Sequence, residues 1–545
     1  MENKVISREE LNKIPQDVLV DMFLQLRDSL MIMQEQNATL IKQVSALQEN
    51  LAVLTQQHFG RKTEKLSEMP GQLHLTFDTS DAINEAEVLT DNGIPEEPEI
   101  ETVVVHRRKT KGKRKADLEG IETVVEPEVT IPDDKLNEMF PGGYHRLPDE
   151  IYKDLEYQPA KFIVHEHHIA VYAGNGDTGV VRADRPERLL KNSILTTSLA
   201  AGIFEEKYVN HSPYNRIESS FKCKDANISR QNMAGWMITI YDRYLQPLKR
   251  EFRKELLKSK LIHCDETPFK MPNNGRGKNS KDYMWVYHTF ERYGSPPIFI
   301  YDYQPTRKAE NPRNFLDGYK GILMTDGYQV YHTLAEERPE ELKVAGCWAH
   351  AKRKFAEIVK ALGKAAKGTI ADEANRRIAA ICHVDKMYME SSFEERLENR
   401  KNSVKPLVDE YFAWLKTLYR NPNIDQSSKT AKAINYSINQ EKYLRLFLTD
   451  AMIPMDNNDA ERSIRTFCVG KKNWQIIDSK QGAEASAMFY SIAETAKANG
   501  LKPYEYFRYL LDQILLHLDD SPQDYIGELV PWSPSLPEFC RKLQK

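Results

Sequence analysis

Two aspartates end two apolar segments, in positions suited to binding a cation. Asp265 ends LIHCD and Asp326 ends ILMTD, and strand alternation would put each aspartate on one face with the residues two and four positions before it. When two such strands are neighbours, their carboxylates repel each other unless a cation lies between them. Because Mg²⁺ prefers hard oxygen ligands, the pair predicts a divalent-metal site that needs a third carboxylate.

The segment PMDNNDAERSIRTFCVGKKNW, residues 454–474, can supply this carboxylate. In a helix, Glu461 would face the aspartates while Arg462 and Arg465 flank it, because side chains three and four residues apart share a side. Basic residues beyond it would bind phosphates, and a tryptophan would stack on an unpaired base. Each acid alone also fits a helix cap or turn. The predicted DNA-contacting residues of this segment are Arg462, Arg465, Lys471, Lys472 and Trp474.

The acids need a scaffold, and five short segments that precede residue 351 are typical of strands. These segments are residues 260–271, 282–290, 296–304, 321–331 and 341–350. Strands followed by helices are the order of an α/β layer, and residues 351–450 are predicted to be mostly helical.

Residues 191–248 have a helical pattern that includes a turn followed by Ser229, a predicted N-cap. The apolar residues that follow suit one buried face and leave Arg230 and Gln231 outward. A helix-turn-helix presents base-reading residues in this way, although helical pairs without a DNA role show the same pattern. The predicted buried face consists of Met233, Trp236, Met237 and Ile240.

Residues 17–58 carry apolar residues at steps of three and four, the pattern of a coiled coil. Asn37 falls at an a position, where a buried amide favours a parallel dimer in fixed register. The alternative is an amphipathic helix that packs its apolar side on its own chain. The seam positions are Phe23, Leu26, Leu30, Met33, Asn37, Leu40, Val44, Leu47, Leu51 and Leu54.

Charge is distributed unevenly, although the net charge is only −4. Residues 69–105 hold nine acids and no Lys or Arg, and residues 106–115 then hold seven Lys and Arg. Such blocks form a solvated tether or, alternatively, a basic arm that neutralises DNA phosphates. The chain has no apolar run long enough to span a bilayer and no signal peptide, so we expect a soluble, cytoplasmic protein that is nucleoid-associated when bound to DNA.

Several of these segments resemble the bacterial transposases of insertion-sequence family sixty-six. They are CDETPFK, MTDGYQVY, CWAHAKRKF, PMDNNDAERSIRTFCVGKKNW and IAETAKANGLKPYEYFRYLL. The resemblance covers nearly the whole chain and implies a ribonuclease-H-like fold, with DDE carboxylates at Asp265, Asp326 and Glu461 and a helical insertion before the last catalytic helix. His350 and Arg353 of CWAHAKRKF then face the same groove, although a purely structural helix explains them equally well.

Members of that family usually carry paired CxxC motifs before the helix-turn-helix, and this chain departs from the pattern. The matching positions read FPGG at residues 140–143 and YAGNG at residues 172–176. His165 and His167 would project from one face of a predicted strand, but two histidines supply at most half a zinc site. We therefore expect no zinc.

The predicted fold class is multidomain α/β. The expected parts are a coiled-coil dimerisation helix (1–66), an acidic then basic linker (67–118), a small strand-rich module (119–185), a helix-turn-helix region (186–250), a ribonuclease-H-like catalytic domain (251–495) with a helical insertion at about 356–450, and a helical tail (496–545).

These features predict a DNA transposase that binds the terminal inverted repeats of its own insertion sequence. Two Mg²⁺ (or Mn²⁺) ions would activate water to nick the DNA, and the freed 3′-hydroxyl would attack target DNA. The expected partners are both DNAs, a second copy bound through the coiled coil, and small accessory proteins of the same element. A catalytically inactive DNA-binding regulator and a metal-dependent nuclease without strand transfer remain alternatives.

Overall fold

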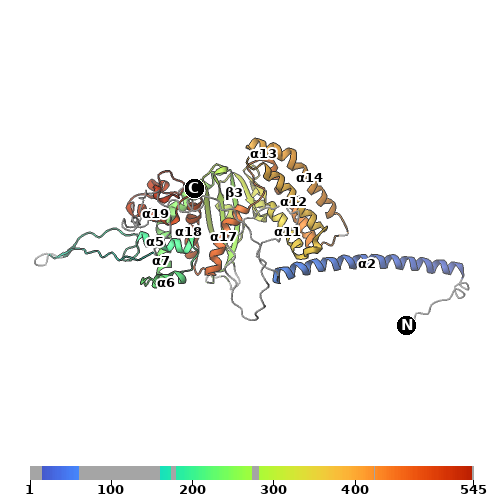
Figure 1. Cartoon of the computed structure of the whole chain (residues 1–545), viewed down its shortest axis with the longest axis horizontal. Helices are drawn as coiled ribbons and strands as arrows, with labels where there is room; N and C mark the ends of the chain where they lie inside the picture. Colours follow the sequence, from blue (N-terminus) through green and yellow to red (C-terminus); the bar gives the residue numbers. More distant parts are fainter. Residues whose placement is uncertain are drawn as a thin grey trace, which may run out of the picture.

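The computed structural model describes residues 15–59, 160–173, 180–272, 276, 281–422 and 424–542. The predicted linker and most of the predicted strand-rich module, FPGG included, lie outside these ranges. A central sheet is surrounded by helices, and one long helix near the N-terminus extends away from this body (Figure 1). None of the described helices combines the length and the apolar character that crossing a membrane requires.

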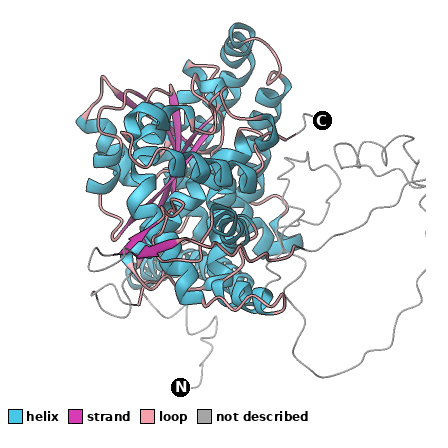
Figure 2. Ribbon diagram, turned by 90° about the vertical axis from the view of Figure 1, so that its left-hand side faces the viewer, coloured by secondary structure: helices cyan, strands magenta, loops and turns pink. Residues whose placement is uncertain are grey.

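Five strands form the central sheet, in the order β5-β4-β3-β6-β7. They are β3 (Leu261–Phe269), β4 (Asp282–Thr289), β5 (Ile298–Gln304), β6 (Gly321–Thr325) and β7 (Leu342–Gly346). The first three form an antiparallel meander, whereas β6 pairs parallel to β3 and β7 parallel to β6. All five predicted strands are confirmed. Helices enclose the sheet (Figure 2), which explains why its strands are nearly continuous apolar runs.

Helix α18 (Lys480–Ala498) runs along the edge strand β5. The backbone N–H of Tyr301 donates to the Ser491 hydroxyl at 2.8 Å, and that of Phe299 donates to the Thr495 hydroxyl at 3.0 Å. An edge strand exposes unpaired backbone groups, so these two hydroxyls replace part of a neighbouring strand.

The helices that precede the sheet are α5 (Thr197–Phe204), α6 (Tyr214–Lys222), α7 (Arg230–Ile240) and α8 (Gln246–Leu256). The predicted N-cap of α7 is confirmed, because the backbone N–H of Asn232 donates to the Ser229 hydroxyl at 3.2 Å. The first two residues of α7, Arg230 and Gln231, are exposed. The buried side chains of α7 are Met233, Met237 and Ile240, and Trp236 is half-buried.

This helical region shares one hydrophobic core with the sheet and the C-terminal segment. Helix α19 (Pro503–Leu516) packs on α5, and the rings of Phe204 and Phe507 stack with their centroids 4.2 Å apart. The α6–α7 pair is therefore fixed on the central sheet through α5 and the C-terminal helices.

A second core joins the other side of the sheet to the helices that follow β7. We call residues 348–450 the helical region. Its main helices are α11 (Trp348–Leu362), α12 (Ile370–Met387), α13 (Phe393–Asn399), α14 (Lys405–Tyr419), α15 (Lys429–Asn439) and α16 (Glu441–Leu444). The predicted helical character is confirmed. Because α11 is continuous from Trp348, the helices begin directly after β7, before the predicted start of the insertion near residue 356.

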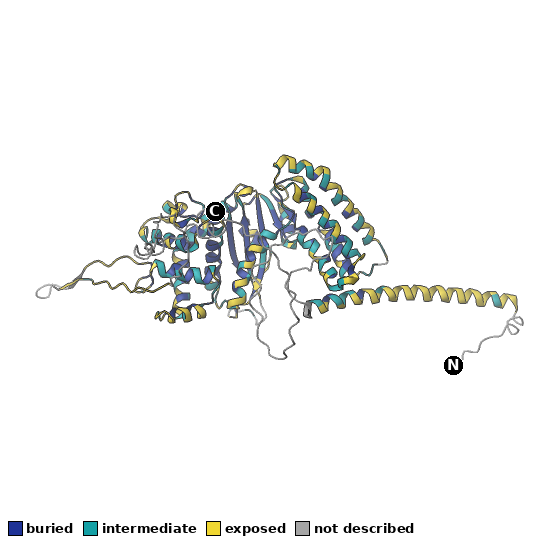
Figure 3. Ribbon diagram, in the orientation of Figure 1, coloured by how far each residue is buried: buried dark blue, intermediate teal, exposed yellow. Residues whose placement is uncertain are grey.

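The N-terminal region forms helix α2 (Gln16–Phe59), as its periodicity predicts. Figure 3 shows it as mostly exposed, in contrast to the buried strands. The segment around His165 and His167 lacks regular secondary structure, so their predicted shared strand face is wrong. Nearby, β1 (Val171–Ala173) pairs antiparallel with the short β2 (Val180–Arg182).

Candidate active site

The sheet brings Asp265 and Asp326 next to each other. His263 of β3 pairs with Met324 of β6, so the same parallel register extended by two residues places Asp265 opposite Asp326. Asp326 directly follows β6, as predicted. The prediction that Asp265 ends its strand is wrong, because β3 continues to Phe269 along β4 after its pairing with β6 has stopped.

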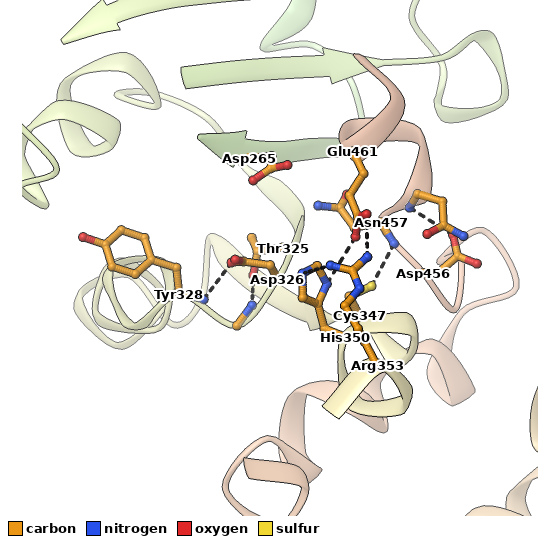
Figure 4. Close-up of polar contacts among 12 residues, drawn as sticks. Asp265, Thr325, Asp326, Tyr328, Cys347, His350, Arg353, Asp456, Asn457 and Glu461 are labelled. Carbon is orange, nitrogen blue, oxygen red and sulfur yellow. Dashed lines mark hydrogen bonds and ion pairs between the residues drawn. The ribbon is translucent and has the colours of Figure 1, made fainter. Parts of the chain in front are cut away.

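Glu461 reaches the same place from helix α17 (Asn458–Trp474), which packs across β3. The predicted helix is therefore confirmed, with Glu461 in its first turn. In Figure 4 the carboxylates of Asp265, Asp326 and Glu461 lie around one space between the sheet, α17 and α11. The structure thus brings together the three acids that the sequence singled out.

Burial and neighbouring negative charges both act on Asp265. Burial raises the pKa of Asp265 well above its usual range, and the negative charges of Glu266 and Asp326 raise this pKa further. Glu461 contributes in the same direction, while the backbone N–H of Glu266, which donates to Asp265 Oδ1 at 2.8 Å, opposes it. A cation bound among these oxygens would remove the repulsion.

Glu266 is a fourth acid of the cluster that sequence reasoning missed, although it directly follows Asp265. Its side chain is only 2% exposed, and burial followed by the charge of Asp326 raises its pKa to about 7. Arg307 partly offsets this effect by donating from Nε to Glu266 Oε1 at 2.8 Å. The guanidinium of Arg307 lies over the Tyr328 ring, 3.8 Å from its centroid.

Arg353 of α11 holds Glu461 in its present orientation, and His350 of the same helix lies close to it. Arg353 Nη2 donates to Glu461 Oε2 at 2.6 Å, and His350 Nδ1 lies 3.5 Å from Oε1 (Figure 4). Burial, together with the charge of Arg353, lowers the pKa of His350. Both His350 and Arg353 therefore lie beside Glu461, while their predicted role toward DNA stays a prediction. Among the described residues, no group of three His, Cys, Asp or Glu side chains is arranged to hold a metal ion.

Asn457 fixes the start of α17 and is a second residue that sequence reasoning missed. It is fully buried, and its Nδ2 donates to the carbonyl oxygen of Cys264 at 3.0 Å. Its backbone N–H donates to Cys347 Sγ at 3.2 Å, at the beginning of α11. Its Oδ1 lies 2.7 Å from His263 Nδ1, which must donate because an amide oxygen only accepts. Asn457 therefore joins β3, α11 and α17, the elements that carry Asp265, Arg353 and Glu461.

The predicted DNA-contacting residues of α17 differ in how accessible they are. Arg462, Arg465 and Lys472 are exposed, as a phosphate-binding surface requires. Lys471 is partly engaged, since its Nζ donates to the carbonyl oxygen of Pro268 at 2.8 Å. Trp474 is half-buried, and its ring lies 5.5 Å from Lys207 Nζ and 5.4 Å from the Phe467 centroid.

The sequence matches three protein-family models. The family model described as Transposase IS66 family matches residues 192–485, and the one described as IS66 C-terminal element matches residues 491–532. A third model, described as Transposase C of IS166 homeodomain, matches residues 46–122, mostly outside the described ranges and across the predicted linker. The matches define a transposase. Because the first model covers more than half of the sequence, the chain belongs to the IS66 transposase family.

Relatives in Sinorhizobium fredii (strain NBRC 101917 / NGR234) extend this similarity. Uncharacterized protein y4qI is 31% identical over 428 residues, which cover 77% of this chain and 76% of the relative. Uncharacterized protein y4hP is 26% identical over 505 residues, 90% of this chain and 88% of the relative. Among solved structures, the Drosophila P element transposase strand transfer complex is similar at a TM-score of 0.32 and 10% identity, over 55% of this chain and 92% of that chain.

Proposed function

We propose that this protein is a DDE-type DNA transposase that binds the ends of its insertion sequence and catalyses metal-dependent strand cleavage and strand transfer. The observation that carries the proposal is the convergence of Asp265, Asp326 and Glu461 from two neighbouring central strands and one crossing helix (Figure 4). Membership in the IS66 transposase family supports it.

The sheet supports the assignment of a ribonuclease-H-like catalytic domain. An antiparallel meander of β3, β4 and β5 is extended at β3 by the parallel strands β6 and β7. Asp265 lies on β3, Asp326 directly follows the neighbouring strand β6, and Glu461 lies on a helix after the last strand, which is the arrangement that the resemblance implies.

The residues at the site fit a divalent cation such as Mg²⁺ or Mn²⁺. The donors are hard carboxylate oxygens, and the buried Oε1 of Glu461 accepts no hydrogen bond from the described residues. Burial and then the charges of Glu266 and Asp326 raise the pKa of Asp265, and a bound cation would oppose these effects. Asp265 and Asp326 would hold the metal, and Glu461 would join them after leaving Arg353. Two bound ions would supply water activation and stabilisation of the leaving oxygen.

The chain's own residues would place the DNA. Arg462, Arg465 and Lys472 would hold backbone phosphates beside the acids, with smaller contributions from Lys471 and Trp474 because both are partly engaged with the protein. At α7, the exposed Arg230 and Gln231 would read bases of the terminal repeats. The sheet, α5 and α7 share one core, which would fix the distance between the base-reading residues of α7 and the acids of the sheet.

The proposal is tested with a labelled DNA fragment that carries one end of the element, incubated with the full chain in Mg²⁺. We expect a nick at the end, transfer of the freed 3′-hydroxyl to a second DNA, and loss of both with a chelator. Nicking without transfer, equally on unrelated DNA, would favour the nuclease. End binding without nicking, even after addition of the element's accessory proteins, would favour the regulator.

A further inference from the structure

Helix α2 has two different faces along the stretch next to the helical region. The seam defined by the heptad pattern remains exposed there, with Leu47 at 66% and Leu51 at 65%. The opposite side, the outer face, is buried at Ala46 and Val53, which are 4% and 2% exposed. An amphipathic helix that packed on its own chain through its apolar side would show the reverse.

The outer face is bound to the helical region by specific contacts. The Glu49 carboxylate accepts the backbone N–H of Thr430 at 2.6 Å and the Thr430 hydroxyl at 3.0 Å. Thr430 lies in the first turn of α15, where a negative charge also stabilises the helix dipole. Lys42 Nζ donates to the carbonyl oxygen of Pro422 at 3.1 Å, and Val53 belongs to the core around α11.

We propose that the outer face of α2 is a permanent docking surface for the helical region of the same chain, and that its exposed seam is occupied by α2 of a second copy. The docked stretch leaves the seam uncovered, and the undocked part of α2 extends away from the body (Figure 1). One helix can therefore contact both partners at once.

The flanking positions of the heptads are compatible with a parallel pair. Arg27 is the only charged residue at the e and g positions between residues 22 and 55, and in parallel register it faces Met22 of the other copy. No like charges meet at these positions, and Asn37 can pair with its counterpart. A second copy thus fits the seam without electrostatic penalty.

In this arrangement, the coiled coil would set the position of each active site relative to the dimer axis. Each α2 would hold α11 and α15 of its own chain, and α11 carries His350 and Arg353, which contact Glu461. The two catalytic sheets would then have a fixed relation to the coiled coil. That consequence rests on the proposed function, whereas docking and dimerisation do not.

The test uses the full chain with two sets of variants. Leu47→Glu combined with Leu51→Glu changes only the seam, and Glu49→Gln changes only the outer face. The matched control for the latter is Glu35→Gln, because Glu35 occupies the same heptad position in the exposed, undocked part of the helix. Mass is measured by light scattering, and docking by hydrogen exchange of peptides that contain Thr430.

We expect the seam variant to be monomeric and to keep slow exchange at Thr430. Glu49→Gln should remain dimeric while exchange at Thr430 accelerates about tenfold, the effect of replacing a charge-assisted hydrogen bond by a neutral one. Glu35→Gln should match the wild type in both measurements. A seam variant that stays dimeric, or equal exchange at Thr430 in the Glu49 and Glu35 variants, would overturn the proposal. Neither measurement depends on DNA cleavage.

Discussion

The acid cluster on the central strands and the exposed start of α7 use polar side chains in opposite ways. In the acid cluster, Asp265 and Glu266 are crowded and largely removed from water, and their pKa values are raised. At α7, Arg230 and Gln231 extend into solvent. Catalysis requires charges whose repulsion a metal can relieve, whereas recognition requires donors that are free to meet a base. The two regions should therefore respond differently to substitution.

The largest effect is expected at the acids. Glu461→Gln and Asp326→Asn keep shape but remove charge, so nicking of an end fragment in Mg²⁺ should fall at least about a thousandfold. End binding measured in Ca²⁺ should remain, because the basic residues are unchanged. Combining both substitutions should add little, since residues that act as one unit are not additive. Unaltered nicking by the Glu461 variant would assign the third carboxylate to another acid.

A smaller loss of cleavage is expected for Asn457→Ala, which removes the partner of His263 and Cys264. The unsatisfied buried groups should lower the free energy of unfolding by about 1 to 3 kcal/mol. Displacement of Glu461 should lower the cleavage rate at saturating DNA by roughly tenfold to a hundredfold, with DNA affinity unchanged. Asn458→Ala is the control. An equal cleavage rate in the two variants would show that Asn457 does not position Glu461.

Substitution of the exposed start of α7 should change binding and leave chemistry intact. Arg230→Ala or Gln231→Ala should weaken binding to the cognate end by about 1 to 3 kcal/mol while affinity for random DNA stays nearly constant. The rate of nicking at saturating DNA should equal that of the wild type. Equal losses on cognate and random DNA would mean that these residues contact phosphates only.

Lys207 offers a further comparison because it is a buried cation, with its Nζ over the rings of Tyr214 of α6 and Trp474 of α17. Burial lowers its pKa from 10.5 to about 8. Below about pH 8 the buried Lys207 is charged in the folded state, and this charge lowers the free energy of unfolding by its full amount. Between about pH 8 and 10.5 the folded state releases the proton while the unfolded state still holds it, so the destabilisation disappears over this range.

Lys207→Met should accordingly raise the free energy of unfolding at pH 7 by about 1 to 3 kcal/mol. This gain should shrink as the pH rises to 10.5, which urea unfolding at several pH values would measure. A gain that is constant over this range would assign the effect to packing alone.

Local patterns in the sequence were sufficient to predict the strands, helix α17 and the N-cap of α7, because apolar periodicity and capping residues act over a few positions. Contacts that join distant segments could not be predicted in this way. Asn457 meets His263 across 194 positions, and Arg353 meets Glu461 across 108. The docked face of α2 was also missed, because two small apolar residues opposite a leucine seam give no periodic pattern.

The central claim is that Asp265, Asp326 and Glu461 surround one metal site, and localised oxidation tests it most directly. Fe²⁺ that occupies the site would generate hydroxyl radicals with ascorbate and peroxide, and these radicals cut the backbone only nearby. The claim predicts protein fragments that end near all three residues, suppressed by excess Mg²⁺ and absent in Asp326→Asn. Cuts confined to other segments, such as the one around His165 and His167, or cuts near the acids that persist in Asp326→Asn, would contradict it.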